Sequence, residues 1–194
     1  MKKRSVMKYN IPVILFAGGQ SSRMGKDKAL LPFAGYSTLS EFQYERLNKL
    51  FKTVYISAKE NKFNFEVLLI PDRYEASSPL VGIVSVFETL DADEVFILSV
   101  DAPFVTAEVI SKLLKNRGGH DAIIAKTKSG RQPLCGIYKR SVLDIALKYL
   151  NQDHHRLGTV LNDVDTKFVF FEDDSAFTNL NHPHEYEEAL KSFN

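Results

Sequence analysis

A short apolar strand that ends in two adjacent glycines constrains this chain more than any other feature. Residues 13–16 read Val-Ile-Leu-Phe, and residues 17–19 read Ala-Gly-Gly. Glycine adopts positive φ angles and lets the backbone approach a ligand closely, and successive free N–H groups form a concavity that binds anions. The loop that follows carries the cations Arg23, Lys26 and Lys28. The sequence therefore predicts a phosphate-binding turn directly after a buried strand.

The spacing of this loop matches neither of the two common phosphate-binding fingerprints. The dinucleotide pattern G-x-G-x-x-G is absent, because Gly18 and Gly19 are adjacent and the next glycine is Gly25. The Walker pattern fails because five residues separate Gly19 from Gly25, and Asp27 stands where serine or threonine belongs. The cations favour a site for nucleotide phosphates, and a glycine-rich turn without a ligand is the alternative.

Length and composition indicate one globular domain. The chain has 194 residues, of which 44% are hydrophobic and 25% are charged, which is enough for one full core. We expect residues 1–9 to be a flexible extension and residues 10–194 to form a single domain. A net charge of +1 supplies no global field for nucleic acid or an anionic membrane, so neither is an expected partner.

Cysteine usage and hydropathy predict a cytoplasmic protein. The single cysteine, Cys135, excludes an internal disulfide and suits a reducing compartment, where we expect it to be a small packed residue. No apolar run reaches the roughly 20 residues needed to span a bilayer. The basic start of the chain is not followed by an apolar signal segment.

Apolar strands alternate with segments of helical period along the chain. Such alternation predicts an α/β fold of the Rossmann-like, doubly wound type, with a mostly parallel sheet covered by helices on both faces. We expect strands at 11–16, 53–58, 66–70, 94–100, 121–125, 134–138 and 168–171. We expect helices with apolar faces near 39–50, 80–90, 107–114, 141–150 and 183–192. Ligands of such folds bind outside the carboxyl ends of the strands, near a topological switch point.

Two carboxylates stand at the ends of predicted strands. Asp101 comes after the strand at 94–100, and Mg²⁺ takes oxygen ligands from one or two carboxylates together with substrate phosphates. Asp101 is therefore the candidate magnesium ligand, and an aspartate that only stabilises the following Ala-Pro bend is the alternative. Asp72 follows the strand at 66–70 in a similar way, and a solvated turn residue is the alternative there.

Four further places are weaker candidates. Gly82, near a helix start, permits either a close ligand or tight packing, and Gln132, in an Arg-Gln-Pro turn, faces either a second substrate or solvent. Asn179 and Asn181 are two residues apart and project the same way on extended backbone, so they reach a cofactor or metal unless they only begin a turn. We expect the pair at 154–155, two adjacent histidines, to lie in a solvated loop.

Four motifs together resemble those of the MobA-like nucleotidyltransferases. Residues 15–31 are similar to the family signature L-A-G-G-x-S-x-R-M-G-x-D-K-x-L. The resemblance continues with Ser-Pro-Leu-Val-Gly at 78–82, Asp-Ala-Pro-Phe at 101–104 and Asn-Leu-Asn-His-Pro at 179–183. These motifs stand in the family's order and spread over nearly the whole chain.

The resemblance implies an activity and a set of partners. It implies a fold like that of nucleotide-diphospho-sugar transferases and a Mg²⁺-dependent transferase that moves GMP from GTP to molybdopterin (the molybdenum cofactor), releasing pyrophosphate. GTP and molybdopterin would then be the substrates, and proteins that deliver molybdopterin or accept the product are candidate partners. The alternatives are a cytidylyltransferase, a sugar- or polyol-phosphate nucleotidyltransferase of the same fold, or a non-catalytic nucleotide-binding protein.

The resemblance also implies roles for individual residues. The catalytic group would be Arg23, Lys28 and Asp101, with Asp101 holding Mg²⁺. The implied nucleotide-binding residues are Phe16, Ala17, Gly18, Gly19, Arg23, Lys28, Ser57, Asp72, Gly82 and Asp101. The residues implied to meet the pterin or to complete the metal site are Gln132, Asn179 and Asn181.

Two positions depart from the family pattern. Ser57 stands where the family carries an asparagine near the base, which bears on the preference for guanine over cytosine. Ser78 stands where a glycine usually precedes Pro-Leu.

Overall fold

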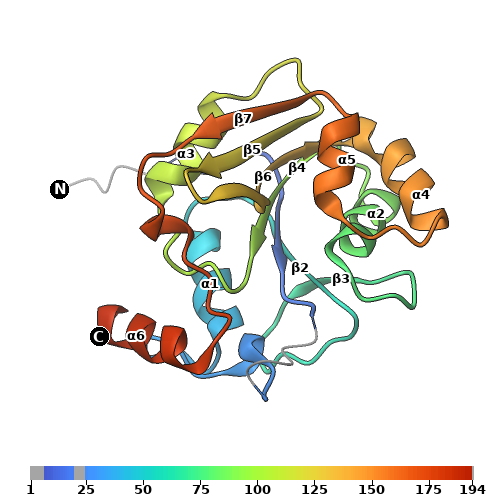
Figure 1. Ribbon diagram of the computed structural model, residues 1–194. Helices are drawn as coiled ribbons and strands as arrows, with labels where there is room; N and C mark the ends of the chain where they lie inside the picture. The colour runs from blue at the N-terminus through green and yellow to red at the C-terminus, as the bar shows by residue number, and fades with distance from the viewer. Residues whose placement is uncertain (1–6, 20–24, 194) are drawn as a thin grey trace.

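One mixed sheet organises the computed structural model, which describes residues 7–19 and 25–193. Seven strands of these residues pair in the order β3-β2-β1-β4-β6-β5-β7 (Figure 1). The strands are β1 (Val13–Phe16), β2 (Val54–Ala58), β3 (Leu68–Pro71), β4 (Glu94–Ser99), β5 (Ala122–Thr127), β6 (Gly130–Lys139) and β7 (Thr166–Phe170). Strands β1 to β4 are mutually parallel, β7 is parallel to β5, and β6 is antiparallel to both of its neighbours.

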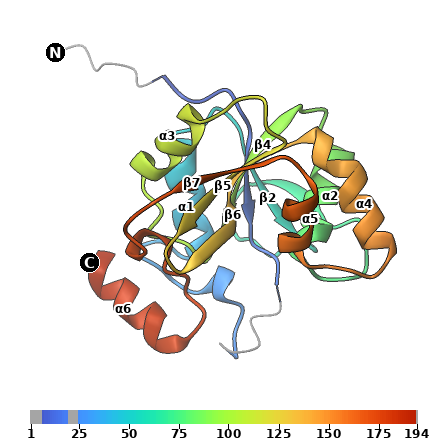
Figure 2. The same ribbon diagram turned by 45° about the horizontal axis from the view of Figure 1, so that its top comes forward.

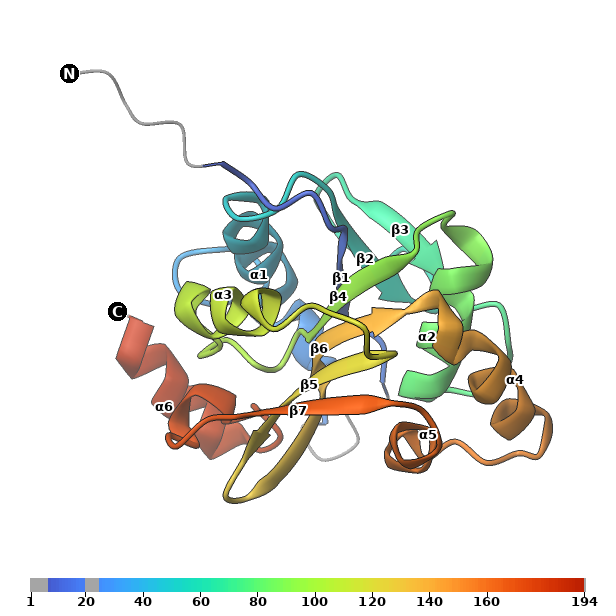
Figure 3. The same cartoon turned by 90° about the horizontal axis from the view of Figure 1, so that it is seen from above.

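Helices cover both faces of the sheet. Figure 3 shows α1 (Leu39–Asn48) and α3 (Ala107–Lys115) on one face, and α2 (Pro79–Thr89), α4 (Leu143–Asn151) and α5 (Leu157–Asp163) on the other. Short 3₁₀ turns are present at η1 (Lys28–Leu30), η2 (Arg140–Val142) and η3 (Ser175–Phe177). The prediction of a doubly wound, mostly parallel α/β sheet is confirmed. No helix of the described residues is long and apolar enough to cross a membrane.

The core has two halves, one on each face of the sheet. Successive side chains of a strand point to opposite faces, so Val13 and Leu15 of β1 pack with α1 and α3, whereas Ile14 and Phe16 pack with α2, α4 and α5. All four are buried, as expected for a central parallel strand covered by helices on both faces. This two-sided burial is the reason that β1 reads as a continuous apolar run.

The last helix, α6 (Pro183–Phe193), lies outside the two helical layers, beside the segment that contains η1 (Figure 2). Aromatic contacts attach it there: the ring of Phe33 lies 6.2 Å from that of Tyr186 and 5.2 Å from that of Phe193. The ring of Phe193 also lies 5.4 Å from that of Phe104, in the loop after β4. This packing brings the segment that leads into α6 to the carboxyl ends of the central strands.

Several predicted boundaries were wrong. Strand β6 begins at Gly130, so Gln132 belongs to a strand and not to a turn before one. The tight connection is instead the two residues between β5 and β6, and antiparallel pairing of Gln132 with Ala125 extends the hairpin. Helix α5 was not predicted, because a seven-residue helix offers little periodicity. Tyr9, expected in a flexible extension, bonds through its N–H to the carbonyl of Leu50 at 2.8 Å, and residues 1–6 lie outside the described residues.

The topological switch point of the sheet falls between β1 and β4. The chain runs from β1 to β2 and β3 on one side, and β4 then pairs with the opposite edge of β1. Phe16, the last residue of β1, is in register with Ser57 of β2 and with Ser99 of β4. The loops after these three strands therefore begin at one level, which is where ligands of doubly wound folds bind.

Candidate active site

A cavity of about 330 Å³ opens at the carboxyl ends of β1, β2 and β3, against the start of α2. Its volume lies within the range of small-molecule pockets. The residues that line it are Phe16, Gly18, Gly19, Ser57, Asp72, Ser77, Ser78, Pro79, Gly82, Ser99 and Leu134. The structure thus brings together six of the residues that the resemblance implied for nucleotide binding, although they come from four separate segments of the chain.

The floor of the cavity depends on a glycine in the first turn of α2. Ser78 begins this helix, and its hydroxyl accepts a hydrogen bond from the N–H of Val81 at 3.3 Å. A Cβ atom on Gly82 would lie 2.7 Å from the ring of Phe16 and 3.3 Å from the hydroxyl of Ser57. The sequence left open whether Gly82 permits a close ligand or tight packing. These short distances show tight packing, and Gly82 also lines the cavity.

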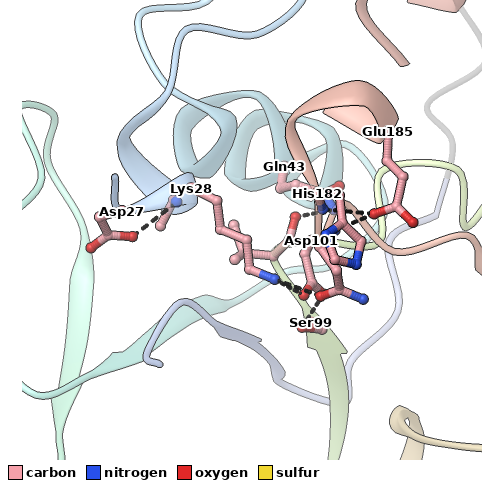
Figure 4. Close-up of polar contacts among 10 residues, drawn as sticks. Asp27, Lys28, Gln43, Ser99, Asp101, His182 and Glu185 are labelled. Carbon is pink, nitrogen blue, oxygen red and sulfur yellow. Dashed lines mark hydrogen bonds and ion pairs between the residues drawn. The ribbon is translucent and has the colours of Figure 1, made fainter. Parts of the chain in front are cut away.

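Beside this cavity, the ammonium of Lys28 joins the loop after β1 to the loop after β4. It forms an ion pair with Asp101 and donates to the side-chain carbonyl of Asn181 at 3.1 Å (Figure 4). The hydroxyl of Ser99 donates to the other carboxylate oxygen of Asp101 at 2.6 Å. Lys28 is the first residue of η1, and Asp27 caps that turn by accepting from the N–H of Ala29 at 3.0 Å. This cap fixes the backbone at Lys28 and so orients its side chain.

The backbone around Asp101 is held from two sides. Gln43 of α1 is buried and donates to the carbonyl of Val100 at 3.1 Å, and Arg46, one turn later, donates to the carbonyl of Pro103. The N–H of Leu180 donates to the carbonyl of Asp101 at 2.9 Å. Asp101 itself is only 9% exposed. A carboxylate fixed in this way is positioned in advance for a cationic ligand.

A smaller cavity of about 160 Å³ lies on the other side of Ser99 and Leu134, which line both cavities. Asp101, Gln132 and Asn179 contribute its polar groups. Pro133, Phe177 and Cys135 also line it, and burial raises the pKa of the Cys135 thiol to about 12. The three polar residues predicted from separate segments therefore meet at one pocket next to the Lys28–Asp101 pair.

The side-chain oxygens of Asp101 and Asn181 fit a hard divalent cation that also binds oxygens of a ligand. Among the described residues, no three His, Cys, Asp or Glu side chains cluster as a closed metal site would require. Oxygen atoms of Asp101 and Asn181 do converge on one cationic atom, the ammonium of Lys28. Mg²⁺ is commonly bound by one or two protein oxygens together with substrate phosphates, so these two residues fit it only when a phosphate completes the shell.

Asp72 lies at the rim of the larger cavity in an unfavourable environment for a carboxylate. Its N–H donates to the carbonyl of Ala58 at 3.1 Å, which fixes the turn after β3. Burial raises the pKa of Asp72, and the nearby ammonium of Lys59 opposes this shift. A carboxylate kept in a partly buried position at a cavity rim is a common property of ligand-binding groups.

Sequence reasoning missed three side chains that reach the site from other segments. The histidines at 154–155 lie in a loop, as expected, but they are only half-exposed: Nδ1 of His155 lies 3.1 Å from the hydroxyl of Ser78, and its Nε2 lies 2.9 Å from Asp153. Glu185 accepts from the N–H groups of Asn181 and His182. The ammonium of Lys62 donates to the carbonyl of Ala17, which directly precedes the glycine loop (residues 18–26). Nothing in their spacing signals these contacts.

Arg23, the remaining predicted site residue, lies outside the described residues, so its predicted role remains a prediction.

A comparison with protein families matches most of the chain. The family described as "MobA-like NTP transferase domain" matches residues 13–166, which run from the start of β1 into β7. The chain belongs to the MobA-like NTP transferase family. The matched range contains the glycine loop, Asp72, Gly82 and Asp101, whereas Asn179 and Asn181 lie beyond it.

Two curated relatives of this MobA-like protein carry the same name. A molybdenum cofactor guanylyltransferase from Campylobacter jejuni (strain 81116 / NCTC 11828) is 40% identical over 177 residues, which cover 90% of this chain and 92% of that protein. A molybdenum cofactor guanylyltransferase from Helicobacter pylori (strain G27) is 35% identical over 190 residues, which cover 94% and 92%.

A solved structure shares the fold of the MobA-like protein. The molybdopterin-guanine dinucleotide biosynthesis protein A from Archaeoglobus fulgidus superposes with a TM-score of 0.81 over 94% of this chain and 98% of that one. The two sequences are 20% identical, so this likeness establishes the fold alone.

Proposed function

We propose that this protein transfers GMP from GTP to the terminal phosphate of molybdopterin and releases pyrophosphate, forming a guanine dinucleotide cofactor. The observation that carries the proposal is the position of Asp101, which lines the smaller cavity, pairs with Lys28 and accepts from Ser99, a residue that lines both cavities. The larger cavity suits a nucleoside, and the smaller one suits part of a second substrate. The name shared by the Campylobacter and Helicobacter relatives supports this choice of substrates.

In this proposal the nucleotide lies with its base and ribose in the larger cavity. Ser57, Asp72 and Gly82 line that end, and Gly18 and Gly19 lie at the opening toward the phosphates. Gly19 has φ of +123°, a conformation that side chains disfavour, so an exposed glycine here keeps the backbone open to a phosphate. We assign the pterin substrate to the smaller cavity, where Gln132 and Asn179 supply polar contacts.

The reaction is one in-line displacement at phosphorus. A terminal phosphate oxygen of molybdopterin forms a bond to the α-phosphorus of GTP, and the bond from that phosphorus to the bridging oxygen breaks. Pyrophosphate leaves with the electron pair of that bond. A phosphate monoester has its second pKa near about 6, so the attacking oxygen is already ionised and needs no strong general base. Catalysis then rests on positioning and on neutralising charge, for which Lys28 and Arg23 are the proposed cations.

We propose Mg²⁺ as the cofactor, held by Asp101 with Asn181 as a further oxygen ligand. When bound, it would neutralise phosphate charge at the reacting centre. Lys28 would then turn its ammonium from these two oxygens toward the pyrophosphate oxygens.

We further propose a cytoplasmic location, which rests on a single cysteine that is buried and free. Proteins that deliver molybdopterin or accept the dinucleotide remain proposed partners.

The deciding experiment measures pyrophosphate release from GTP and molybdopterin with Mg²⁺, and repeats it with CTP, ATP and UTP. We expect release with GTP and little with the other nucleotides. Release with CTP alone would replace the proposal with cytidylyl transfer, and binding of GTP without release under any condition would indicate a nucleotide-binding protein without turnover.

A further inference from the structure

One lysine outside the predicted site touches both ends of the glycine loop. The ammonium of Lys62, in the segment between β2 and β3, donates to the carbonyl of Ala17 at 3.0 Å and forms an ion pair with Asp27. Ala17 is the last residue before the glycines, and Asp27 is the residue that caps η1. A single cation therefore connects the two points between which residues 18–26 run.

Both ends of this connection are themselves fixed. Ala17 is buried, and its N–H donates to the carbonyl of Ser57 at 3.0 Å. Asp27 uses one carboxylate oxygen to cap η1 and the other to pair with Lys62. The cap precedes Lys28 directly, so a shift of Asp27 also moves the residue that carries the site's ammonium.

The segment that carries Lys62 is anchored on α1. The ring of Phe65 lies 5.5 Å from that of Tyr44 and 5.9 Å from that of Phe63. Asn64 donates to the hydroxyl of Ser37 at 3.2 Å, just before the start of α1. The side chains of Lys62 and Asp27 are only 21% and 32% exposed, so solvent screens this pair less than a surface pair. Lys62 is thus held at a defined place.

We propose that Lys62 is a positioning residue for nucleotide binding, which sets the distance between the two ends of the glycine loop and the direction of Lys28. This inference rests on the proposed function, because the nucleotide is the ligand whose phosphates the loop would meet. Groups that are already fixed, as Ala17 and Asp27 are, lose little conformational entropy when a ligand binds beside them. Lys62 acts through Ala17 and Asp27, and not by contact with the phosphates.

The test compares Lys62→Met and Asp27→Asn, alone and together, by calorimetric titration with GTP and Mg²⁺. Asparagine still caps η1, because its side-chain carbonyl accepts the same N–H, but it removes the charge that pairs with Lys62. We expect each variant to weaken GTP binding about tenfold, as for the loss of one charge-assisted hydrogen bond, and the double variant to be no weaker than either. Lys62→Arg keeps the positive charge that Lys62→Met removes, so it should bind GTP with most of the wild-type affinity. The matched control, Lys49→Met at the exposed end of α1, should bind as the wild type does.

Three results would overturn the inference. If Asp27→Asn binds normally while Lys62→Met binds weakly, Lys62 is a direct phosphate ligand. If both bind normally, the connection has no role in binding. If Lys62→Met only lowers the melting temperature and leaves GTP affinity unchanged, its role is structural.

A second readout does not depend on GTP. Lys26 is exposed and lies between the two connected points, so endoproteinase Lys-C should cleave after it several-fold faster in Lys62→Met than in the wild type or in Lys49→Met. Unchanged cleavage would contradict the inference. If the wild type binds no GTP, the proposed function fails, and the cleavage rates alone decide the role of Lys62.

Discussion

Lys28 and Asp101 are 73 residues apart in the sequence and form an ion pair at the switch point of the sheet. Their side chains are 17% and 13% exposed, so the pair is largely shielded from solvent. Asn181, from the segment before α6, accepts from the same ammonium. Three separate parts of the chain therefore supply the oxygens and the cation that the proposed reaction needs.

Replacement of Asp101 tests the metal assignment. Asp101→Asn keeps the size of the side chain and an oxygen that can accept from Ser99, but it removes the charge that attracts a divalent cation. We expect turnover to fall by about 10²- to 10³-fold, and the Mg²⁺ concentration for half-maximal rate to rise. Asp173→Asn, an exposed carboxylate on another loop, is the control. Near-normal turnover of Asp101→Asn at saturating Mg²⁺ would contradict the assignment.

Replacement of Lys28 tests the cation. Lys28→Met keeps the aliphatic chain and removes the charge that we assign to the phosphates. Loss of a hydrogen bond to a charged group costs about 1.5–3 kcal/mol, so we expect kcat/KM for GTP to fall about ten- to a hundredfold. Lys191→Met, on an exposed position of α6, should retain wild-type kinetics. Unchanged kinetics of Lys28→Met would remove Lys28 from the site.

The sequence predicted those parts of the fold and site that local pattern and topology determine. The predicted strand at 94–100 matches β4 to within one residue. The prediction succeeded because the middle of this strand is buried on both faces and is therefore a continuous apolar run. The position of Asp101 near the loop after β1 followed from one rule, that parallel strands bring their carboxyl ends to one edge. Cys135, expected to be a small packed residue, is buried at 3% exposure.

The contacts that the sequence did not predict are those made by long side chains across the fold. Lys62 lies 45 residues from Ala17 and 35 from Asp27, and His155 lies 77 residues from Ser78. Such pairs depend on how loops pack, which neither periodicity nor spacing encodes. The extension of β6 back to Gly130 was missed because Pro133 reads as a turn residue, although the structure accommodates it in this strand.

Replacement of Gly82 tests the floor of the larger cavity. In Gly82→Ala the added methyl would lie 2.7 Å from the ring of Phe16, which must shift. Overpacking costs about 1–3 kcal/mol, which outweighs a gain in helix propensity of up to about 1 kcal/mol. We expect a lower free energy of unfolding, measured with urea, and weaker GTP binding because Phe16 and Ser57 move.

Gly158 in α5 provides the matched control for this substitution. Nothing lies within 4 Å of a Cβ atom placed there, so Gly158→Ala should leave the protein as stable or slightly more stable. Equal effects of the two substitutions would contradict the role assigned to Gly82.

Replacement of Asp72 tests how much its partly buried carboxylate, at the rim of the larger cavity, destabilises the fold. Burial raises its pKa in the folded protein, against the opposing effect of Lys59, so ionisation of Asp72 destabilises the fold at neutral pH. Asp72→Asn should therefore melt higher than the wild type at pH 7, on the order of 1–2 °C. The difference should shrink as the pH falls toward 3.8, where the wild-type carboxyl becomes neutral as well. A variant that is less stable than the wild type at pH 7 would contradict this account.

Replacement of Glu185 tests whether the cap of α6 positions Asn181. Its carboxylate accepts from the N–H of Asn181 at 2.7 Å and from that of His182 at 2.8 Å (Figure 4). Burial raises the pKa of Glu185, but these two donors outweigh it and hold the pKa below its usual value. The stabilisation is therefore complete above the usual pKa of 4.5 and is lost as the pH falls through the lower folded-state value. Glu185→Ala should cost about 1 kcal/mol at pH 7 and much less in acid.

Glu185→Gln separates the cap from the charge, because its amide oxygen still accepts from both N–H groups. We expect this variant to keep most of the stability and of kcat/KM for GTP, and to lose the pH dependence of the cap. Glu185→Ala should lower kcat/KM in addition to stability, since Asn181 loses the bond that fixes its backbone near Lys28. If Glu185→Ala loses stability but keeps wild-type kcat and KM at a temperature where it is folded, the cap holds α6 without positioning Asn181.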